Sequence, residues 1–129
     1  MKTSLRFPIL LLIVSTVLAS CSRADDFVGN YSTNPSGKPE LAISTKSGKF
    51  YVSLFDAGKW STPEEVSPVA DKDIRELFGE DAKIVRASLG RESFAIFRVS
   101  KGASIKDLGV LPSNYLMMFA VPRPLYKVP

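Results

Sequence analysis

Four carboxylates, arranged in two pairs, are the first side chains of this sequence whose spacing suggests chemistry. Glu64 and Glu65 are adjacent, and Asp71 and Asp73 are separated by one residue. Paired carboxylates can transfer protons or bind calcium. The Asp-x-Asp spacing, however, lacks the other ligands and the glycine of an EF-hand loop. Each pair also lies where a helix is predicted to begin, and a helix dipole favours negative charge there. The sequence therefore predicts helix capping and no metal site.

The other residue types exclude most common catalytic arrangements. The chain has no histidine, which removes the commonest general base and the commonest zinc ligand. Cys21 is its one cysteine, so no intrachain disulfide can form. Serine and lysine are frequent, but neither G-x-S-x-G nor S-x-x-K occurs. We expect no enzymatic activity and no cofactor.

Two predicted loops carry candidate partner-binding residues: Trp60, Arg91 and Glu92. Trp60 stands in a Gly/Lys/Ser loop, and tryptophan is enriched at interface hot spots. Gly90-Arg91-Glu92 stands at a predicted hairpin tip, where Arg91 offers directed donors to the cleft of a partner. A plainer interpretation exists for each loop. The indole covers the core or the mouth of a barrel, and Arg91 and Glu92 are ordinary charges of an exposed turn.

Alternating apolar and polar residues predict the strands that position these loops. Residues 39–46 and 49–55 form a tight hairpin around Ser47-Gly48. Residues 83–89 and 93–99 form a second hairpin, and the strand over 93–99 is apolar on both faces.

The segment between these hairpins is predicted to be helical. Thr62-Pro63-Glu64-Glu65 has the form of a capping box, although Pro68 ends any helix there within about a turn. Asp71 is the expected N-cap of a helix over 72–78, and Gly79 suits its C′ position. The face of this helix expected to lie on the sheet comprises Ala70, Ile74, Leu77 and Phe78.

The C-terminal quarter contributes a predicted central strand. Residues 115–121 are almost continuously apolar. Pro122 and Pro124 lack an amide hydrogen, so the segment over 125–128 is expected to be a short edge strand. We therefore predict a mainly β fold, a small antiparallel curled sheet or barrel packed against a short helix.

The first residues of the chain have the pattern of an export signal. Lys2 and Arg6 precede an apolar run over 7–18, which is shorter than the roughly 20 residues that span a membrane. The run ends in Leu18-Ala-Ser-Cys21. This pattern resembles the lipobox of bacterial lipoprotein signal peptides. A plain secretory signal, with Cys21 an ordinary residue, is the alternative.

The resemblance implies a division of the chain. Cleavage between Ser20 and Cys21 would remove the signal peptide, residues 1–20, and Cys21 would carry the lipid. Residues 21–26 would form a lipidated tether, whose Ser22–Asp26 part spans at most about 17 Å. Residues 27–129 would form a single β-rich domain. Ser22 follows the cysteine where enteric-type bacteria place Asp for inner-membrane retention, so the resemblance implies the outer membrane, facing the periplasm.

Charge gives no support for nucleic-acid binding. Residues 21–129 carry 15 basic and 13 acidic side chains, with no block of five or six like charges.

Three functions remain open. A lipobox, a short tether and a small β domain resemble immunity and lysozyme-inhibitor lipoproteins, which implies a non-catalytic binder that neutralises a toxin, an effector or a cell-wall hydrolase. Gly29-Asn-Tyr31 resembles the Gly-x-Trp opening of calycin-type barrels, which implies a carrier of a lipid or another apolar compound. An envelope scaffolding lipoprotein is the third function.

Overall fold

The computed structural model describes residues 27–106 and 108–129. The predicted signal peptide, the predicted cleavage between Ser20 and Cys21, the predicted lipid attachment at Cys21 and the predicted tether therefore lie outside the described residues. Within the described ranges, no helix is long and apolar enough to cross a membrane.

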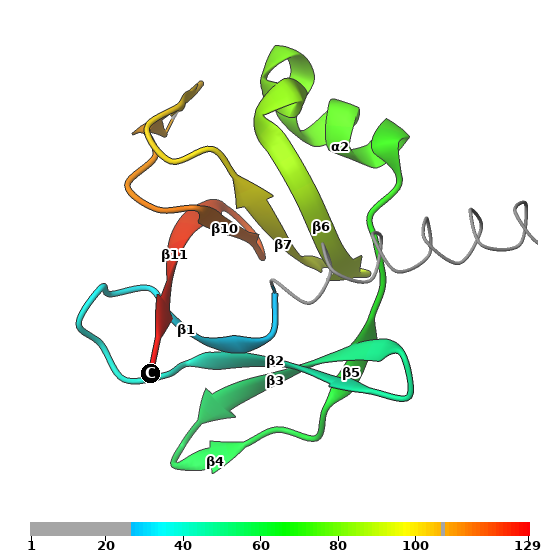
Figure 1. Ribbon diagram of the computed structural model, residues 1–129, viewed down its shortest axis with the longest axis vertical. Coiled ribbons are helices and arrows are strands. Elements are labelled where there is room, and N and C mark those ends of the chain that lie inside the picture. The colour runs from blue at the N-terminus through cyan, green and yellow to red at the C-terminus, as the bar shows by residue number, and fades with distance from the viewer. Residues whose placement is uncertain (1–26, 107) are drawn as a thin grey trace, which may run out of the picture.

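Nine strands of the described residues form one strongly curled antiparallel sheet (Figure 1), which confirms the predicted fold class. The strand order is β4-β3-β2-β1-β11-β10-β7-β6, with β5 also beside β3. Their bounds are Gly29–Ser32 (β1), Leu41–Lys46 (β2), Lys49–Asp56 (β3), Lys59–Trp60 (β4), Glu64–Val66 (β5), Val85–Arg91 (β6), Phe94–Val99 (β7), Tyr115–Met118 (β10) and Pro122–Val128 (β11). A separate small hairpin joins β8 (Ser104–Ile105) to β9 (Gly109–Val110), and the helices are α2 (Asp71–Phe78) and the 3-10 helix η1 (Gly79–Ile84).

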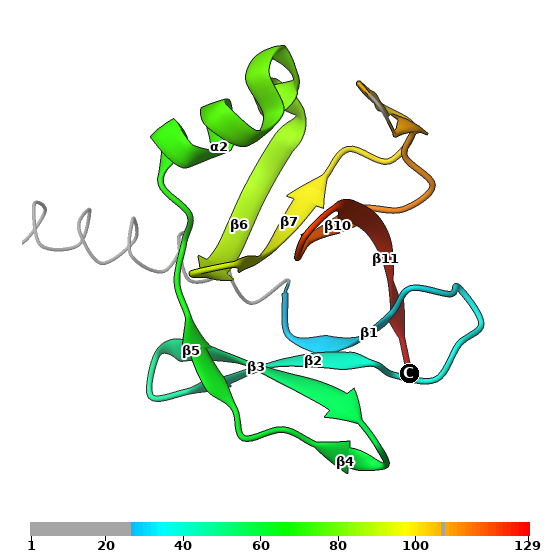
Figure 2. The same ribbon diagram turned by 180° about the vertical axis from the view of Figure 1, so that it is seen from behind.

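The two ends of the curled sheet meet at one point. Ser67, directly after β5, exchanges two backbone hydrogen bonds with Gly90 of β6, at 3.0 and 2.8 Å. Figures 1 and 2 both show β5 rising to the tip of the β6–β7 hairpin at this point. A Cβ atom on Gly90 would lie 2.9 Å from the Phe94 carbonyl oxygen and 3.0 Å from Val69. Glycine is therefore required for this close approach.

Two apolar cores lie on opposite faces of β7. Phe94 and Ile96 face the inside of the curl, whereas Ala95, Phe97 and Val99 face the layer formed by α2, η1 and β8–β9. The ring centroid of Phe78 on α2 lies 4.9 Å from that of Phe97. This alternation confirms that the strand predicted over 93–99 is buried on both faces.

Both hairpins at the two ends of β3 have tight two-residue turns. Ser47 and Gly48 have φ angles of 56° and 78°, as a type I′ turn requires. Ala57 and Gly58, with 52° and 79°, form the second such turn. The first turn was predicted from its sequence. The second was predicted only as a loop, and the structure shows that it returns the chain into β4.

The helix predicted over 72–78 is confirmed, but the segment before it is not helical. Residues 64–66 pair with β3 as β5, with Val66 opposite Phe50. The predicted capping box is therefore wrong, because burial of Val66 beside β3 outweighs local helix signals. Ala70, not Asp71, is the N-cap of α2, with no side-chain cap bond. Leu77, expected on the buried face, is 49% exposed.

The C-terminal strand is not the short edge strand that was predicted. β11 begins at Pro122 and lies between β10 and β1. The first half of β11 pairs with β10. On its other side, β1 pairs only with the β11 residues Tyr126 to Val128. No β1 residue lies opposite Pro122 or Pro124, so the missing amide hydrogens remove no bond to β1. The strand predicted over 115–121 correspondingly ends at Met118, where the chain turns into β11.

Candidate protein-binding mouth

The open end of the curled sheet is surrounded by three adjoining hollows of about 350, 710 and 450 Å³. Phe119, in the turn between β10 and β11, lines all three. We call the residues that line these hollows, together with Trp60, the mouth. One end of each long strand lies here. The mouth contains the C-terminal residues of β3 and β6, the N-terminal residues of β2, β7 and β11, and Thr33, which follows β1.

The opposite ends of the same strands form what we call the base. It consists of Gly29, Lys46, Lys49, Val85, Val99, Tyr115 and Val128, each at the far end of a strand whose other end reaches the mouth. Phe27, the first described residue, directly precedes β1 on the base side. Phe27 also lines a fourth hollow, of about 270 Å³, together with Pro68 and Val69, which line the mouth as well.

Aromatic and aliphatic side chains are exposed around the mouth. Phe55, Trp60 and Phe119 are 43%, 44% and 54% exposed, and Leu54 and Val121 are also exposed. The rings of Phe55 and Trp60 meet edge to face with centroids 5.1 Å apart. The predicted loop at Trp60 is in fact β4, paired with β3 so that Trp60 lies opposite Phe55. Each ring supports the other, which holds the indole at the surface.

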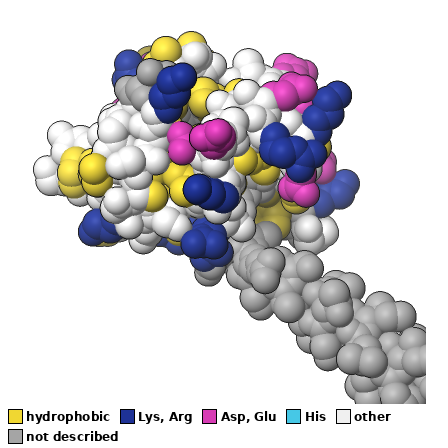
Figure 3. All heavy atoms as spheres, turned by 90° about the horizontal axis from the view of Figure 1, so that it is seen from above, with side chains coloured by type: hydrophobic (Ala, Val, Ile, Leu, Met, Phe, Trp, Pro, Cys, Tyr) yellow, Lys and Arg dark blue, Asp and Glu magenta, His cyan; other side chains and the backbone are white. Residues whose placement is uncertain are grey.

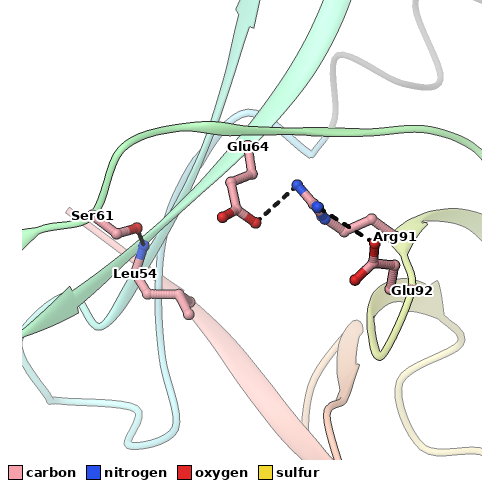
Figure 4. A network of polar contacts seen from close by, with 5 residues as sticks. All are labelled: Leu54, Ser61, Glu64, Arg91 and Glu92. Atoms are coloured by element: carbon pink, nitrogen blue, oxygen red, sulfur yellow. Dashed lines mark hydrogen bonds and ion pairs between the residues drawn. The ribbon is translucent and has the colours of Figure 1, made fainter.

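Charged side chains cross the mouth between β5 and the β6–β7 hairpin. Arg91 donates from Nη1 to Glu64 Oε2 at 2.8 Å, and its Nη2 lies 3.8 Å from Glu92 Oε1 (Figure 4). Ser61 Oγ, which also lines this hollow, accepts a bond from the Leu54 amide at 2.9 Å. Gly90 and Arg91 belong to β6, so the predicted hairpin tip is wrong by two residues. The turn itself is Glu92-Ser93.

The structure brings Arg91 and Glu92 together and places Trp60 on the same end of the sheet, next to Ser61. It separates the four carboxylates that were grouped from the sequence. Glu64 and Glu65 lie on β5, and Asp71 and Asp73 lie in the first turn of α2. Within the described ranges, no cluster of three or more metal-ligating side chains occurs.

Glu40 carries the one resolved pKa shift among the described titratable groups, and it lines the mouth. The pKa of its carboxyl is lowered, chiefly by the backbone amide of Thr33, which donates to Oε2 at 2.7 Å. The hydroxyls of Ser32 and Thr33 donate to the same oxygen at 2.8 Å, and Arg123 adds a favourable charge. Partial burial opposes these effects. Glu40 thus remains ionised and fixes the loop between β1 and β2 at the rim.

The inside of the curl, in contrast, is filled by side chains. Tyr31 is fully buried, and its hydroxyl donates to the Phe27 carbonyl oxygen at 2.5 Å. The Tyr115 ring meets the rings of Tyr31 and Phe27 edge to face, at centroid distances of 5.1 and 6.2 Å. Lys127 Nζ lies 6.0 Å from the Tyr31 ring and 5.7 Å from the Tyr115 ring. These aromatic residues close the base.

The sequence did not indicate the central residue of the mouth. Phe119 was assigned to a strand interior, together with Val121, because the apolar run continues to residue 121. The signal that limits this strand is Pro122: it opens the paired strand β11, so a tight turn must precede it.

The charges of the mouth are unbalanced. Its hollows are lined by six carboxylates, Glu40, Asp56, Glu64, Asp73, Glu76 and Glu92, but by only two basic residues, Arg91 and Arg123. The whole chain has a formal charge of +4. On the face seen from above, by contrast, acidic and basic side chains are intermixed, with hydrophobic side chains visible between them (Figure 3).

Comparison with protein-family models, curated proteins and solved structures gives no match for this chain.

Proposed function

We propose that this chain is a non-catalytic binding lipoprotein of the bacterial envelope, anchored through Cys21, which neutralises a toxin, an effector or a cell-wall hydrolase by binding it at the mouth. The observation that carries the proposal is the group of exposed aromatic residues around Phe119. Partner-binding surfaces are enriched in aromatic residues and arginine, and contiguous exposed apolar patches mark interaction sites. Phe55, Trp60, Phe119 and Arg91 provide this combination on one end of the sheet.

A carrier of calycin type has less support. Such a carrier needs an internal cavity lined by apolar side chains. The residues that would line it, including Tyr31, Ile96, Leu116 and Leu125, are buried against other side chains of the two cores. The hollows of the mouth lie at the rim and share the exposed Phe119.

The proposal is tested with the soluble segment from Ser22 to Pro129 immobilised as bait. Lysates of the host and of competing bacteria are passed over it, and bound proteins are identified by mass spectrometry and assayed for hydrolase or toxin activity. We expect a protein bound in a one-to-one complex whose activity falls on binding. Recovery of no such protein from any lysate would contradict the proposal.

Matched variants locate the binding surface. Trp60→Ala and Phe119→Ala remove exposed rings from the mouth, and each is expected to weaken the complex by about tenfold or more, as hot-spot truncation does. Val110→Ala removes an apolar side chain that is even more exposed, at 67%, from β9, outside the mouth, and should leave binding unchanged. Equal losses in all three variants would show that the mouth is not the site.

A further inference from the structure

The largest of the three hollows of the mouth, about 710 Å³, is a groove between α2 and the β6–β7 turn. We call it the helix groove. Apolar side chains line it, among them Val69, Phe94 and Met118. Two more of its apolar residues, Leu77 of α2 and Phe119 of the β10–β11 turn, are 49% and 54% exposed. About half of each of these two residues is therefore open to a partner.

The exposed leucine of the helix groove has two carboxylates beside it on α2. Asp73, Glu76 and Leu77 stand at positions i, i+3 and i+4, the spacing that makes side chains neighbours on a helix. All three line the helix groove. The basic residues of the same helix, Lys72 and Arg75, do not line it. One face of α2 therefore presents apolar and acidic groups side by side.

The negative charge of the helix groove is not neutralised by neighbouring side chains. No Lys or Arg nitrogen of the described residues lies within 4.0 Å of the carboxylate of Asp73 or Glu76. Among the described residues that line the groove, Arg91 alone is basic. Its guanidinium already lies 2.8 Å from Glu64 and 3.8 Å from Glu92. The groove therefore has an excess of negative charge next to exposed apolar surface.

We infer that the helix groove receives a basic side chain of the protein partner, an arginine or lysine flanked by apolar residues. This inference rests on the proposed function, because it takes the occupant to be a protein. Arg and Lys side chains lay their aliphatic stems on apolar surface while their charged heads reach polar groups. Leu77 and Phe119 match the stem, and Asp73 and Glu76 match the head. Hollows of about 300–1,000 Å³ hold drug-sized ligands, so the groove has room for one residue and its neighbours.

Two short peptides test the charge requirement. Acetyl-Leu-Arg-Leu-amide is compared with acetyl-Leu-citrulline-Leu-amide, whose central side chain is neutral and of nearly the same shape. The full chain, in phosphatidylcholine nanodiscs, carries ¹³C at its methionine methyl groups. Met118 lines the helix groove, whereas Met117 lines the adjoining hollow of about 450 Å³. We expect both peptides to shift the Met118 methyl resonance but not that of Met117. The arginine peptide should bind about fivefold more tightly, and this preference should shrink in high salt.

Matched variants separate the charged and the apolar contribution. Asp73→Asn with Glu76→Gln should weaken binding of the arginine peptide about fivefold and leave binding of the citrulline peptide unchanged. That unchanged binding also shows that the groove is still folded. Leu77→Ala should weaken both peptides equally. The control, Glu65→Gln with Glu80→Gln, removes two exposed carboxylates that do not line the groove, and should change neither affinity.

Several results would overturn the inference. They are no shift of the Met118 resonance up to about 20 mM peptide, equal affinity for the two peptides, a shift of Met117 in its place, or equal losses in the two pairs of charge variants. Spermidine that binds as tightly as the arginine peptide would assign the groove to free polyamines and not to a protein.

The inference and the proposed function can fail separately. Capture of a hydrolase or toxin does not depend on these peptides. A captured partner without peptide binding would remove this inference and leave the proposed function. Peptide binding without any captured partner would contradict the proposed function alone.

Discussion

The base and the mouth use the same residue types in opposite ways. At the base, the rings of Phe27, Tyr31 and Tyr115 contact one another, and the Tyr31 hydroxyl is bonded to a backbone carbonyl. At the mouth, Phe55, Trp60 and Phe119 remain about half exposed. Burial converts an aromatic ring into folding free energy, while exposure leaves that free energy to be gained when a partner covers it. If a partner binds at the mouth as proposed, the rings that stabilise the fold and the rings that recognise the partner are different sets of residues.

The largest expected effect comes from truncating one ring at each end. Tyr31→Ala should lower the free energy of unfolding by about 3–5 kcal/mol, because it leaves a cavity and an unpaired Phe27 carbonyl. Phe119→Ala should lower it by no more than about 0.5 kcal/mol. Urea unfolding followed by circular dichroism measures both. Similar losses in the two variants would contradict the separation of the two ends.

The closure between β5 and β6 is the next most sensitive position. Gly90→Ala should destabilise the fold by about 1–3 kcal/mol, because its Cβ meets the Phe94 carbonyl oxygen and Val69. Gly58→Asn is the control, since nothing lies within 4 Å of that position and asparagine tolerates its positive φ. Thermal unfolding of the two variants compares them. A stable Gly90→Ala variant would mean that the two ends of the sheet can separate without cost.

The ion pair across the mouth should contribute little to folding. The side chains of Arg91 and Glu64 are 36% and 58% exposed, and exposed pairs typically contribute about 0.5 kcal/mol. A double-mutant cycle with Arg91→Ala and Glu64→Ala measures this coupling in unfolding. The same variants should weaken binding of a partner more than they weaken the fold. A coupling above about 2 kcal/mol would make the pair a structural element instead.

The smallest expected effect is a pH dependence at the rim. Because the pKa of Glu40 is lowered in the folded state, its ionised form stabilises the fold at neutral pH. That stabilisation is complete above the ordinary glutamate pKa and is lost as the pH falls through the lowered value. The melting temperature of Glu40→Gln should therefore lie below that of the wild type at neutral pH, and the difference should shrink in acid. A difference that does not change with pH would contradict this account.

Local patterns predicted the elements whose signals lie within a few residues. Ser47-Gly48 between two alternating segments predicted the β2–β3 hairpin, because few residues adopt the positive φ of that turn. The apolar residues on both faces of 93–99 predicted a strand covered on two sides. These features depend on backbone sterics and side-chain period, which neighbouring residues determine.

Where distant segments compete, local patterns predicted the wrong element. Glu64–Val66 carries helix-start signals, but it pairs with the edge of β3 and forms the strand β5. Pro122 and Pro124 disfavour an interior strand, but the short β1 leaves their side of β11 without a partner, and the strand forms. Both outcomes depend on which strand edges are left without a hydrogen-bonding neighbour once the rest of the sheet has formed.

By itself, the sequence determined the mainly β class, the hairpin turns, the helix over 72–78 and the absence of histidine chemistry, because each follows from residue type and local spacing. Only the tertiary structure decided that Trp60, Arg91, Glu92 and Phe119 gather at one end of the sheet and that Ser67 meets Gly90. The physical reason is that curling and strand register determine which strand ends meet, and register is set by contacts between residues far apart in the chain.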